Sequence, residues 1–447
     1  MGASDLNVKS THMLANPRSV VEDPVSGKVF VVDTGNGRVL RYPSVKLLNS
    51  GASAEAVFGR GATPAEQLGG PSSCTLDAAG NLWVSDTGYN RVLRFANAIN
   101  SPAGTPAVAV LGQPDFTTTT QRPPSEFTLN SPGPLAIGPG GELWVSEVIP
   151  EYGAYKNTRV VRFDQAATAA SGTAASGVLG RVDFYDQQTP TLSSSTVFAS
   201  VTSLFCEPSG RLWVMSNLGR GGSLYELYRF DAAATKPNGA AADSSVRIDP
   251  APASGYVSPP GSGGPPTSHA PSFYIDADGG LMLLVNIKPY ERGGIFHWYD
   301  GFLLRLPNAE ALPTLPTVID QPSFVEYSLN LSGMPHELPN ALGLSPAADG
   351  FVWVADARAT AQRYKLPPFE AVPGEQQVSF EIVPASGGDD VLALRFASIP
   401  GRDYQLFDSP DLTTWLPGEK LSATGTSSVF LRTPAPGNAF FKVVLLP

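Results

Sequence analysis

Short apolar runs separated by turns recur along the whole of this 447-residue chain. The runs are rich in β-branched and aromatic residues, as in VFVVD at residues 29–33 and LWVSD at residues 82–86. Short runs of this kind between turn residues are typical of β-strands. No stretch keeps apolar residues at helical spacing over about a dozen positions. The 45 glycines and 42 prolines supply the turns. The pattern predicts an all-β protein.

One unit of this pattern occurs six times between residues 16 and 367. It consists of an apolar strand, a glycine-containing turn, a second strand with a large residue near its start, a loop and a third strand, followed in five units by a short fourth run. The large residues lie 53, 61, 69, 69 and 71 residues apart, and they are Phe30, Trp83, Trp144, Trp213, Met282 and Trp353. A period that drifts in this way indicates a constant core with loops of variable length.

Four short strands per unit are typical of a β-propeller blade. A single blade cannot bury both of its faces, so the units must stack around an axis with the large residues between neighbours. The sequence therefore predicts a six-bladed β-propeller over residues 16–367. Because the sixth unit lacks a fourth run, residues 1–15 either supply the strand that closes the ring or are a vector remnant.

The repeat ends before residues 368–447, where the pattern changes. Strands are expected there at QVSFEIVP, VLALRFAS, DYQLFDS, SSVFLRTP and FFKVVLL. Their alternation and turn spacing predict a small C-terminal β-sandwich as a separate domain.

Two units carry a longer shared motif, of the form PxxxxxDxxGxLxVxDxGxNRVxxF with a trailing VLGQPDF. This motif resembles the NHL-repeat family of β-propellers. The resemblance implies that Asp33 with Arg38, and Asp86 with Arg91, tie the hairpin between the second and third strands. Local chemistry agrees, because a carboxylate can accept the backbone donors of a tight turn and an arginine shortly after it. We therefore interpret these charged residues as structural.

The segments GRDYQLFDSPDLTTWLPGE and GNAFFKVVLLP resemble modules appended to the C-termini of secreted bacterial proteins. This resemblance implies a secreted or periplasmic location, with the export signal absent from this chain. The N-terminal residues contain no apolar run, so we expect no membrane insertion. The net charge of −10 makes nucleic acid an unexpected partner. Cys74 and Cys206 are expected to be small buried hydrophobes.

The long loops predict where a ligand would bind. In a propeller, the connections from second to third strands and the connections between blades emerge on the same face, and the insertions of this chain are all of these two kinds. Insertions on one face usually mark a binding face. The candidate ligand-binding residues in them are Tyr152, Tyr155, Arg220, Tyr225, Tyr290, Arg292, His297, Trp298 and Tyr299. Such residues suit a glycan or a protein ligand, although the rings could instead pack inward and hold their own loops.

An enzyme is the competing class, since the family resemblance extends to six-bladed lactonases and to lyases that hold a metal over the axis. The histidine pattern of those lyases does not transfer, because His336 precedes its inner strand and no other unit has an equivalent. A zinc site needs three or four converging ligands. A composite site of His269, His297 and His336 is the alternative.

Glu22 is the remaining candidate for chemistry. When the six units are aligned, the other residues in the same column as Glu22 are Leu76, Ile137, Cys206, Ile275 and Leu344. A carboxylate on an inner strand either lines the channel, holds an ion there or pairs with a nearby arginine, with Arg18 as the local partner.

Together these patterns predict a non-catalytic binding protein that presents a propeller loop face to a glycan or protein ligand. No catalytic residue, metal ligand or cofactor is assigned, although a metal ion in the channel is left open. The alternative is a metal-assisted lactonase or lyase with its site at the top of the channel, and a pure interaction scaffold is a third possibility.

Overall fold

The structure is a computed structural model. It describes residues 14–47, 53–149, 157–186, 198–218, 225–248, 268–276, 279–287, 290–292, 295–297, 302–306, 329–330, 341–347, 351–356, 360–365, 376–378, 380–384, 392–398, 403–409, 416–424, 427–432 and 440–445. The chain divides into two compact units, Met1–Lys365 and Leu366–Pro447. Within the described residues, no helix is long and apolar enough to cross a membrane.

The first unit consists of small antiparallel sheets in chain order. Its first four sheets contain β1 (Pro17–Glu22), β2 (Val29–Asp33), β3 (Arg38–Tyr42) and β4 (Ala56–Phe58); β5 (Pro71–Leu76), β6 (Leu82–Asp86), β7 (Arg91–Phe95) and β8 (Ala109–Leu111); β9 (Leu135–Ile137), β10 (Leu143–Ile149), β11 (Asn157–Phe163) and β12 (Gly177–Leu179); and β13 (Val201–Cys206), β14 (Leu212–Asn217), β15 (Tyr225–Phe230) and β16 (Ser244–Ile248).

Two further sheets and a hairpin complete the described part of this unit. They contain β17 (Ser268–Ile275), β18 (Leu281–Ile287), β21 (Phe302–Leu306) and β22 (Leu329–Asn330); β23 (Ala341–Pro346), β24 (Phe351–Asp356) and β25 (Thr360–Lys365); and the hairpin of β19 (Tyr290–Arg292) and β20 (Ile295–His297). Single turns of 3-10 helix lie at η2 (Thr34–Asn36), η3 (Pro64–Glu66), η4 (Thr87–Tyr89), η5 (Ala166–Thr168) and η6 (Ala233–Thr235).

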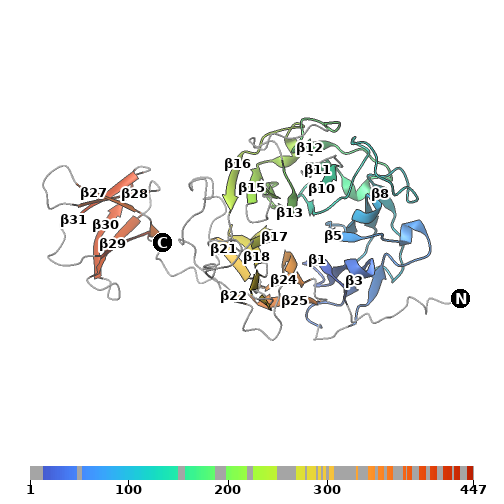
Figure 1. The fold of residues 1–447 in the computed structure, drawn as a ribbon, viewed down its shortest axis with the longest axis horizontal. Coiled ribbons are helices and arrows are strands. Elements are labelled where there is room, and N and C mark those ends of the chain that lie inside the picture. Colours follow the sequence, from blue (N-terminus) through green and yellow to red (C-terminus); the bar gives the residue numbers. More distant parts are fainter. Residues whose placement is uncertain are drawn as a thin grey trace. The chain divides into compact units, whose positions relative to one another are not determined.

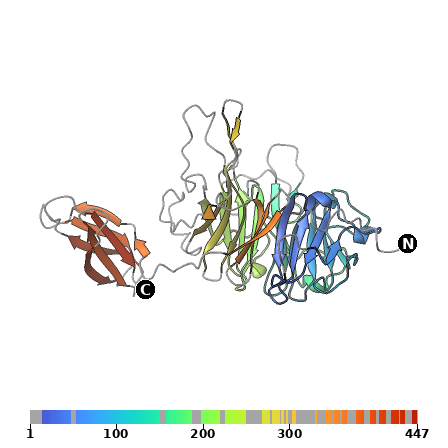
Figure 2. The same cartoon turned by 90° about the horizontal axis from the view of Figure 1, so that it is seen from below.

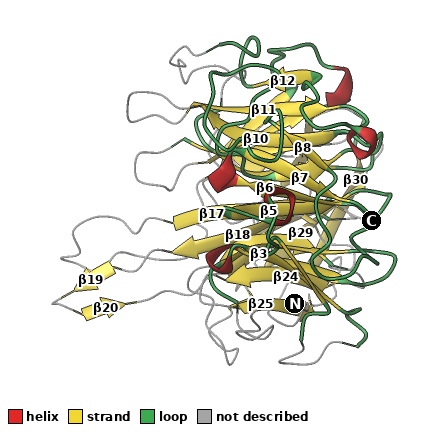
Figure 3. Cartoon of the chain, turned by 90° about the vertical axis from the view of Figure 1, so that its right-hand side faces the viewer, coloured by secondary structure: helices red, strands yellow, loops and turns green. Residues whose placement is uncertain are grey.

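These sheets follow one another around a common centre, so the first unit is a β-propeller (Figure 1). Their inner strands β1, β5, β9, β13, β17 and β23 face the centre. Seen from the side, the strands run across the thickness of the ring (Figure 2). The β19–β20 hairpin projects beyond the ends of β17 and β18 (Figure 3). The segment before Asn16 that was expected to close the ring lies outside the described residues, apart from Leu14 and Ala15.

Large residues on the second strands fill the spaces between neighbouring sheets. Trp83 of β6 is fully buried and packs with Leu135 and Leu143 of the following sheet. Trp144 of β10 packs in the same way against the next sheet, whose Leu212 shares its cluster. The strand registers place Phe30, Trp83, Trp144, Trp213, Met282 and Trp353 opposite equivalent residues of the inner strands. The large residue that recurs in each unit of the sequence is therefore the residue that packs between neighbouring sheets.

The last sheet of the propeller is joined to the first through Trp353. Its indole N–H donates to Glu22 Oε2 at 2.7 Å, and its ring shares a core cluster with Val20 and Val31. The indoles of Trp83 and Trp213 donate instead to an acid in their own sheet, Asp77 and Glu207.

The register explains why the last sheet differs. Ala347 follows Pro346 as Asp77 follows Leu76, so the sheet of Trp353 has no acid at that position. Glu22 of the first sheet takes its place. Glu22 thus accepts a hydrogen bond from Trp353 rather than pairing with Arg18, and it serves ring closure. The residue that shares its column in β23 is Pro346, whereas Leu344 occupies the column of Val20. The expected column of Glu22 was therefore wrong at that strand.

Buried ion pairs tie the second strand of a sheet to the third. Asp33 and Arg38 face each other in the ladder with Oδ2 and Nε 2.7 Å apart, and Asp86 and Arg91 do so at 2.9 Å. The other oxygen of Asp86 accepts the backbone N–H of Gly69 at 2.7 Å. The prediction that these residues are structural agrees with this geometry, because each carboxylate fixes both its hairpin and the incoming chain.

The third sheet has the same arrangement with a longer acid. Glu147 Oε1 lies 2.7 Å from Arg159 Nε, and both side chains are fully buried. Glu147 Oε2 accepts the backbone N–H of Asn130 at 2.6 Å. Burial raises the pKa of the Glu147 carboxyl, while the Arg159 charge acts against this shift. A buried charge that loses its partner is far more costly than an exposed one.

The second unit contains two antiparallel sheets. One is formed by β26 (Gln376–Val378), β32 (Phe440–Leu445), β29 (Asp403–Ser409) and β30 (Leu416–Ser422), and the other by β27 (Phe380–Pro384), β28 (Leu392–Ala397) and β31 (Ser427–Arg432). Side chains from both sheets share one apolar core, in which Phe396 lies 4.9 Å from Tyr404 and 5.6 Å from Phe430 between ring centroids.

We predict that Arg159→Leu lowers the free energy of unfolding by about 3–5 kcal/mol, because it leaves the Glu147 carboxylate buried without its cation. Urea unfolding followed by tryptophan fluorescence measures this change. Lys236→Leu is the control, since it breaks the more exposed pair with Asp243 and should cost at most about 1 kcal/mol. Equal effects of the two substitutions would contradict the proposed role of the buried pair.

We also predict that Glu22→Gln and Trp353→Phe are not additive. A double-mutant cycle should give a coupling free energy of about 1–2 kcal/mol, because a hydrogen bond to a charged group contributes about 1.5–3 kcal/mol and the amide of Gln replaces part of it. The pair Glu22→Gln with Trp83→Phe is the matched control, because Trp83 bonds Asp77 instead, and it should be additive. Additivity in both cycles would show that the hydrogen bond from Trp353 to Glu22 does not stabilise the closed ring.

Candidate functional site: the axial cavity

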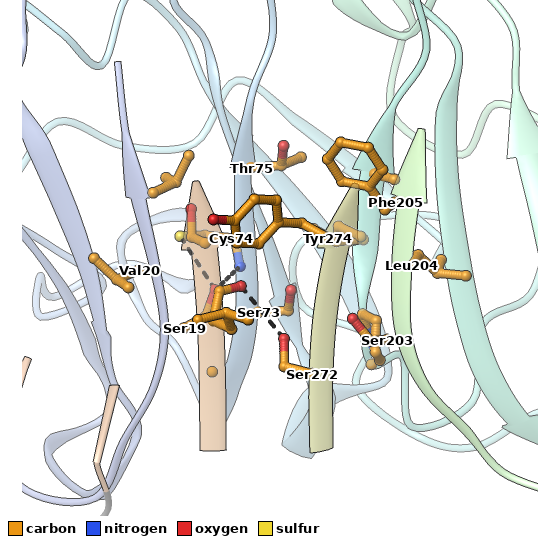
Figure 4. A pocket seen from close by; sticks show the side chains of 18 of the residues that line it. Ser19, Val20, Ser73, Cys74, Thr75, Ser203, Leu204, Phe205, Ser272 and Tyr274 are labelled. Atoms are coloured by element: carbon orange, nitrogen blue, oxygen red, sulfur yellow. Dashed lines mark hydrogen bonds between the residues drawn. The ribbon is translucent and has the colours of Figure 1, made fainter. Parts of the chain in front are cut away.

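A cavity of about 1130 Å³ lies on the axis of the propeller. Residues of the described inner strands β1, β5, β9, β13, β17 and β23 line it, and residues of β1, β5, β13 and β17 are seen in Figure 4. This placement follows from the fold, because an inner strand pairs on one side only and its other edge faces the axis. The cavity is therefore bounded by backbone edges and by the side chains of β1, β5, β9, β13, β17 and β23.

The inner strands carry a register shift near one end. In β1 the pairing shifts between Pro17 and Ser19, in β5 between Pro71 and Ser73, and in β13 between Val201 and Ser203. Similar shifts occur in β17 and β23. A bulge leaves one residue without a cross-strand partner and re-aims its side chain. The residues released in this way in the first three strands are Arg18, Ser72 and Thr202, and all three line the cavity.

A row of hydroxyl groups follows the bulges. Ser19, Ser73, Ser203 and Ser272 occupy the same register position in β1, β5, β13 and β17. Their positions around the cavity are seen in Figure 4.

These serines also connect neighbouring inner strands, which have no ladder between them. Ser19 Oγ accepts the N–H of Cys74 at 3.4 Å, and Ser203 Oγ accepts the N–H of Phe273 at 3.5 Å. Ser272 Oγ donates to the carbonyl of Leu344 at 3.3 Å. The row therefore has a structural role, and it leaves uncharged donors and acceptors around the cavity.

The rest of the wall is mainly apolar. Val20, Leu135, Leu204, Phe273 and Leu344 form one level of it. Further along, the rings of Phe205 and Tyr274 lie 6.4 Å apart between centroids, and both are seen in Figure 4. An apolar wall with few polar groups is typical of small-molecule sites.

The two cysteines lie in this wall as thiols. Burial raises the pKa of Cys74 to about 12, with its hydrogen bond to Ser19 acting in the opposite direction. Burial and the nearby carboxylates of Glu142 and Glu207 raise the pKa of Cys206 to about 12. Because the thiolate is the nucleophile, neither cysteine is suited to nucleophilic catalysis near neutral pH. The expectation of small buried hydrophobes agrees with Cys74, while Cys206 is only partly buried.

Two charged residues, Arg18 and Glu22, line the cavity among the described residues. Glu22 is 7 % exposed and bonded to Trp353. Arg18 is exposed, and within the described ranges its side chain makes no hydrogen bond and no ion pair. The lining is thus close to neutral overall, with a cation at the bulged end.

A metal ion does not fit the described wall. No group of three or more histidine, cysteine or acidic residues that could hold an ion occurs among the residues the structure describes. The cavity wall offers Glu22, two protonated thiols and hydroxyl groups, whereas a zinc site requires three or four converging ligands. No catalytic step is therefore derived through a metal.

The predicted loop residues fall in three groups. Tyr225 begins β15, is 1 % exposed and lines the axial cavity. Tyr290 and Arg292 lie on β19 and His297 ends β20, directly across from Tyr290 in the ladder. Outside the described residues lie Tyr152, Tyr155, Arg220, Trp298 and Tyr299.

The proposed histidine site is likewise only partly placed. His269 lies near the start of β17 opposite Asn286, and His336 lies outside the described residues. Ligand binding by the aromatic and arginine residues of the loops stays a prediction.

Sequence reasoning missed the bulge residues and the serine row. A signal for the row was present, because serine stands two positions after the first strand residue in PRS, PSS and VTS at residues 17–19, 71–73 and 201–203. Comparing inner strands column by column would have found it. The bulges had no such signal, since they depend on strand pairing.

No protein-family model and no curated protein matches this chain. Solved structures do match in fold. A gluconolactonase from Xanthomonas campestris is 14% identical with a TM-score of 0.42, covering 80% of this chain and 88% of the other. A streptogramin B lyase is 11% identical with a TM-score of 0.36 over 85% and 90%. A luciferin-regenerating enzyme is 11% identical with a TM-score of 0.45 over 77% and 85%.

These matches correct the function expected from the sequence. The main expectation was a non-catalytic binding protein, but the structures similar to this chain are named for enzymes. The names of these structures therefore contradict the expectation of a non-catalytic protein. The likeness concerns the fold alone, so the chemistry has to be argued from the cavity.

We predict that neither thiol reacts appreciably with a disulfide reagent at pH 8 in the native protein. At a pKa of about 12, the thiolate fraction at pH 8 is about 1 in 10,000. Both thiols should react after denaturation in guanidinium, which returns them to a pKa of about 8.5. The absorbance of the released thiol measures this. A fast stoichiometric reaction of Cys74 in the native state would mean that its thiolate is stabilised in the cavity.

Proposed function

We propose that this chain is an enzyme that opens an uncharged cyclic ester, a lactonase, with the substrate held in the axial cavity. The observation that carries the proposal is the cavity itself, which is lined by every inner strand of the propeller. Small-molecule sites are concave and mostly apolar, with a few polar groups that orient the ligand, and their volumes are about 300–1000 Å³. At about 1130 Å³, this cavity has room for a substituted or large ring.

The chemistry of the wall favours a neutral substrate. The serine row and the unpaired backbone edges offer hydrogen bonds without net charge, while Val20, Leu135 and Leu204 cover the carbon skeleton of a ring. A highly charged substrate such as a phosphate ester would meet Arg18 as the described cation of the wall and would leave its other charges uncompensated. A lactone is polar at the ester and apolar elsewhere, which matches this wall.

The reaction itself consumes one water. The water oxygen bonds to the acyl carbon, the bond from this carbon to the ring oxygen breaks, and a proton passes to the ring oxygen. The product is one open chain that carries a hydroxyl group and a carboxylic acid, and the acid loses its proton to solvent near neutral pH. A lyase would instead break the ring without adding water, so the product mass separates the two reactions.

The finer description of the protein belongs to the same proposal. We propose six blades of NHL type, a C-terminal β-sandwich and a secreted or periplasmic location, supported by the repeat motif and by the likeness of the C-terminal segments to modules of secreted proteins. The loop residues Tyr290, Arg292 and His297 are proposed to contact the ligand as it enters. Nucleic acid and membrane insertion are not expected.

A panel of lactones tests the proposal. We expect the purified full-length chain to open at least one five-, six- or larger-membered lactone, with a product one water heavier by mass spectrometry. Thr75→Trp places a bulky ring in the cavity and should lower kcat/KM by about tenfold or more, a cost of about 1.4 kcal/mol. Thr235→Trp, at an exposed residue of the turn η6, is the matched control and should leave kcat/KM unchanged. Absence of turnover across the panel, or full activity of Thr75→Trp, would refute the proposed site.

A further inference from the structure

We infer that Arg18 is the anion-binding group of the axial cavity, taking the negative charge that forms when the ester is opened. This inference rests on the proposed function and names the residue that would stabilise its charged species. In lactone hydrolysis the carbonyl oxygen becomes an oxyanion after water attacks, and the product then carries a carboxylate. A guanidinium can donate two parallel hydrogen bonds to either group.

The β-bulge is the first observation behind this inference. The pairing of β1 with β2 shifts between Pro17 and Ser19, so Arg18 has no partner across the ladder. The same shift in β5 and β13 releases the small hydroxyl residues Ser72 and Thr202 toward the cavity. One strand of the propeller therefore carries a long cation where its equivalents carry short neutral groups.

The backbone around Arg18 is held in place. Asp33 Oδ1 accepts the N–H of Ala15 at 2.6 Å, and the carbonyl of Ala15 accepts the N–H of Gly35 at 2.7 Å. On the other side, the Arg18 carbonyl lies so close to Gly343 that a β-carbon there would be 2.4 Å from its oxygen. A glycine is required at this position of β23 for β1 to approach. The side chain of Arg18 thus extends from a fixed base, which lowers the entropic cost of holding a ligand.

The charge of Arg18 is available to a ligand. Arg38, Arg91 and Arg159 are each buried in an ion pair, whereas Arg18 is exposed and has no hydrogen bond or ion pair in the described part of the propeller. Glu22 cannot neutralise it. Its carboxylate accepts the indole N–H of Trp353, and four residues of extended strand separate the α-carbons of Arg18 and Glu22 by about 13 Å.

Neutral hydroxyl groups lie at the same end of two other inner strands. The Thr202 hydroxyl oxygen, on β13, is buried and has no hydrogen-bond partner among the described residues. Ser72 lies on the neighbouring inner strand β5, where its hydroxyl bonds that of Thr87 at 2.6 Å, while Thr87 donates to the carbonyl of Pro132. One cation with neutral donors on the cavity wall suits a single carboxylate. It does not suit a dianion, which would need a second positive charge.

Binding of hexanoate and hexanamide, measured by isothermal titration calorimetry, tests the inference without requiring turnover. The two probes have the same length and differ in charge. We expect the wild-type chain to bind hexanoate more tightly than hexanamide. Arg18→Gln should weaken hexanoate binding by about tenfold or more and leave hexanamide unchanged, while Arg18→Lys should retain most of the affinity. Arg60→Gln is the matched control, because Arg60 is exposed and lies outside the cavity lining.

The pH profile separates arginine from the histidines of the loops. Since Arg18 keeps its charge throughout, hexanoate affinity should be constant between pH 6 and 9. A loss of affinity between pH 6 and 7 would assign the anion site to a histidine and overturn the inference. Equal binding of hexanoate by wild type and Arg18→Gln, or no binding by wild type, would do the same. Failure of the proposed function is a separate result, seen as hexanoate binding that depends on Arg18 without opening of any lactone.

Discussion

The structure depends on the burial of both faces of each small sheet. A sheet of four short strands has two apolar faces and no core of its own, so it is stable only with a neighbour on each side. Trp83 and Trp144 satisfy this requirement by packing into the following sheet. Repeating the contact turns the chain around an axis and directs one unpaired strand edge of each sheet to the centre. The cavity thus results from the packing of Trp83 and its equivalents between sheets. Its wall is formed by residues that also stabilise the ring.

Much of the fold could be predicted from the sequence, because the signals involved are local. The short apolar runs, the glycine turns and the position of Trp83 and its equivalents are visible in any one copy of the repeat. The role of Asp86 with Arg91 was also accessible, since the two residues are close in sequence and face each other across one hairpin. The column of Leu344 was misjudged because Pro339 was aligned with Pro17, although pairing places Ala341 opposite Asp356 as Pro17 is placed opposite Asp33. Strand pairing fixes register, and a proline does not.

The site was harder to predict, for a physical reason. Its lining residues come from inner strands up to about 330 residues apart, from Arg18 to Ala347, and each residue looks unremarkable in its own strand. Arg18 reads in sequence as a partner for Glu22, but in the extended strand β1 the two residues lie near opposite ends. The aromatic loops predicted a binding protein, whereas the proposed substrate site lies at the mainly apolar wall of the axial cavity. Tyr225 alone among those residues is described as part of the wall.

The closure through Trp353 and Glu22 also has a consequence for how the protein opens. Most of the sheets that meet in the ring are joined by continuous chain, but the sixth and first sheets meet through side chains contributed by opposite ends of the propeller. A seam of this kind has no peptide bond across it, so it is held by non-covalent contacts alone, among them the cluster around Val20 and Val31. Amide protons on β1 and β23 should therefore exchange with solvent through local opening, whereas those on β6 and β10 should exchange only on global unfolding.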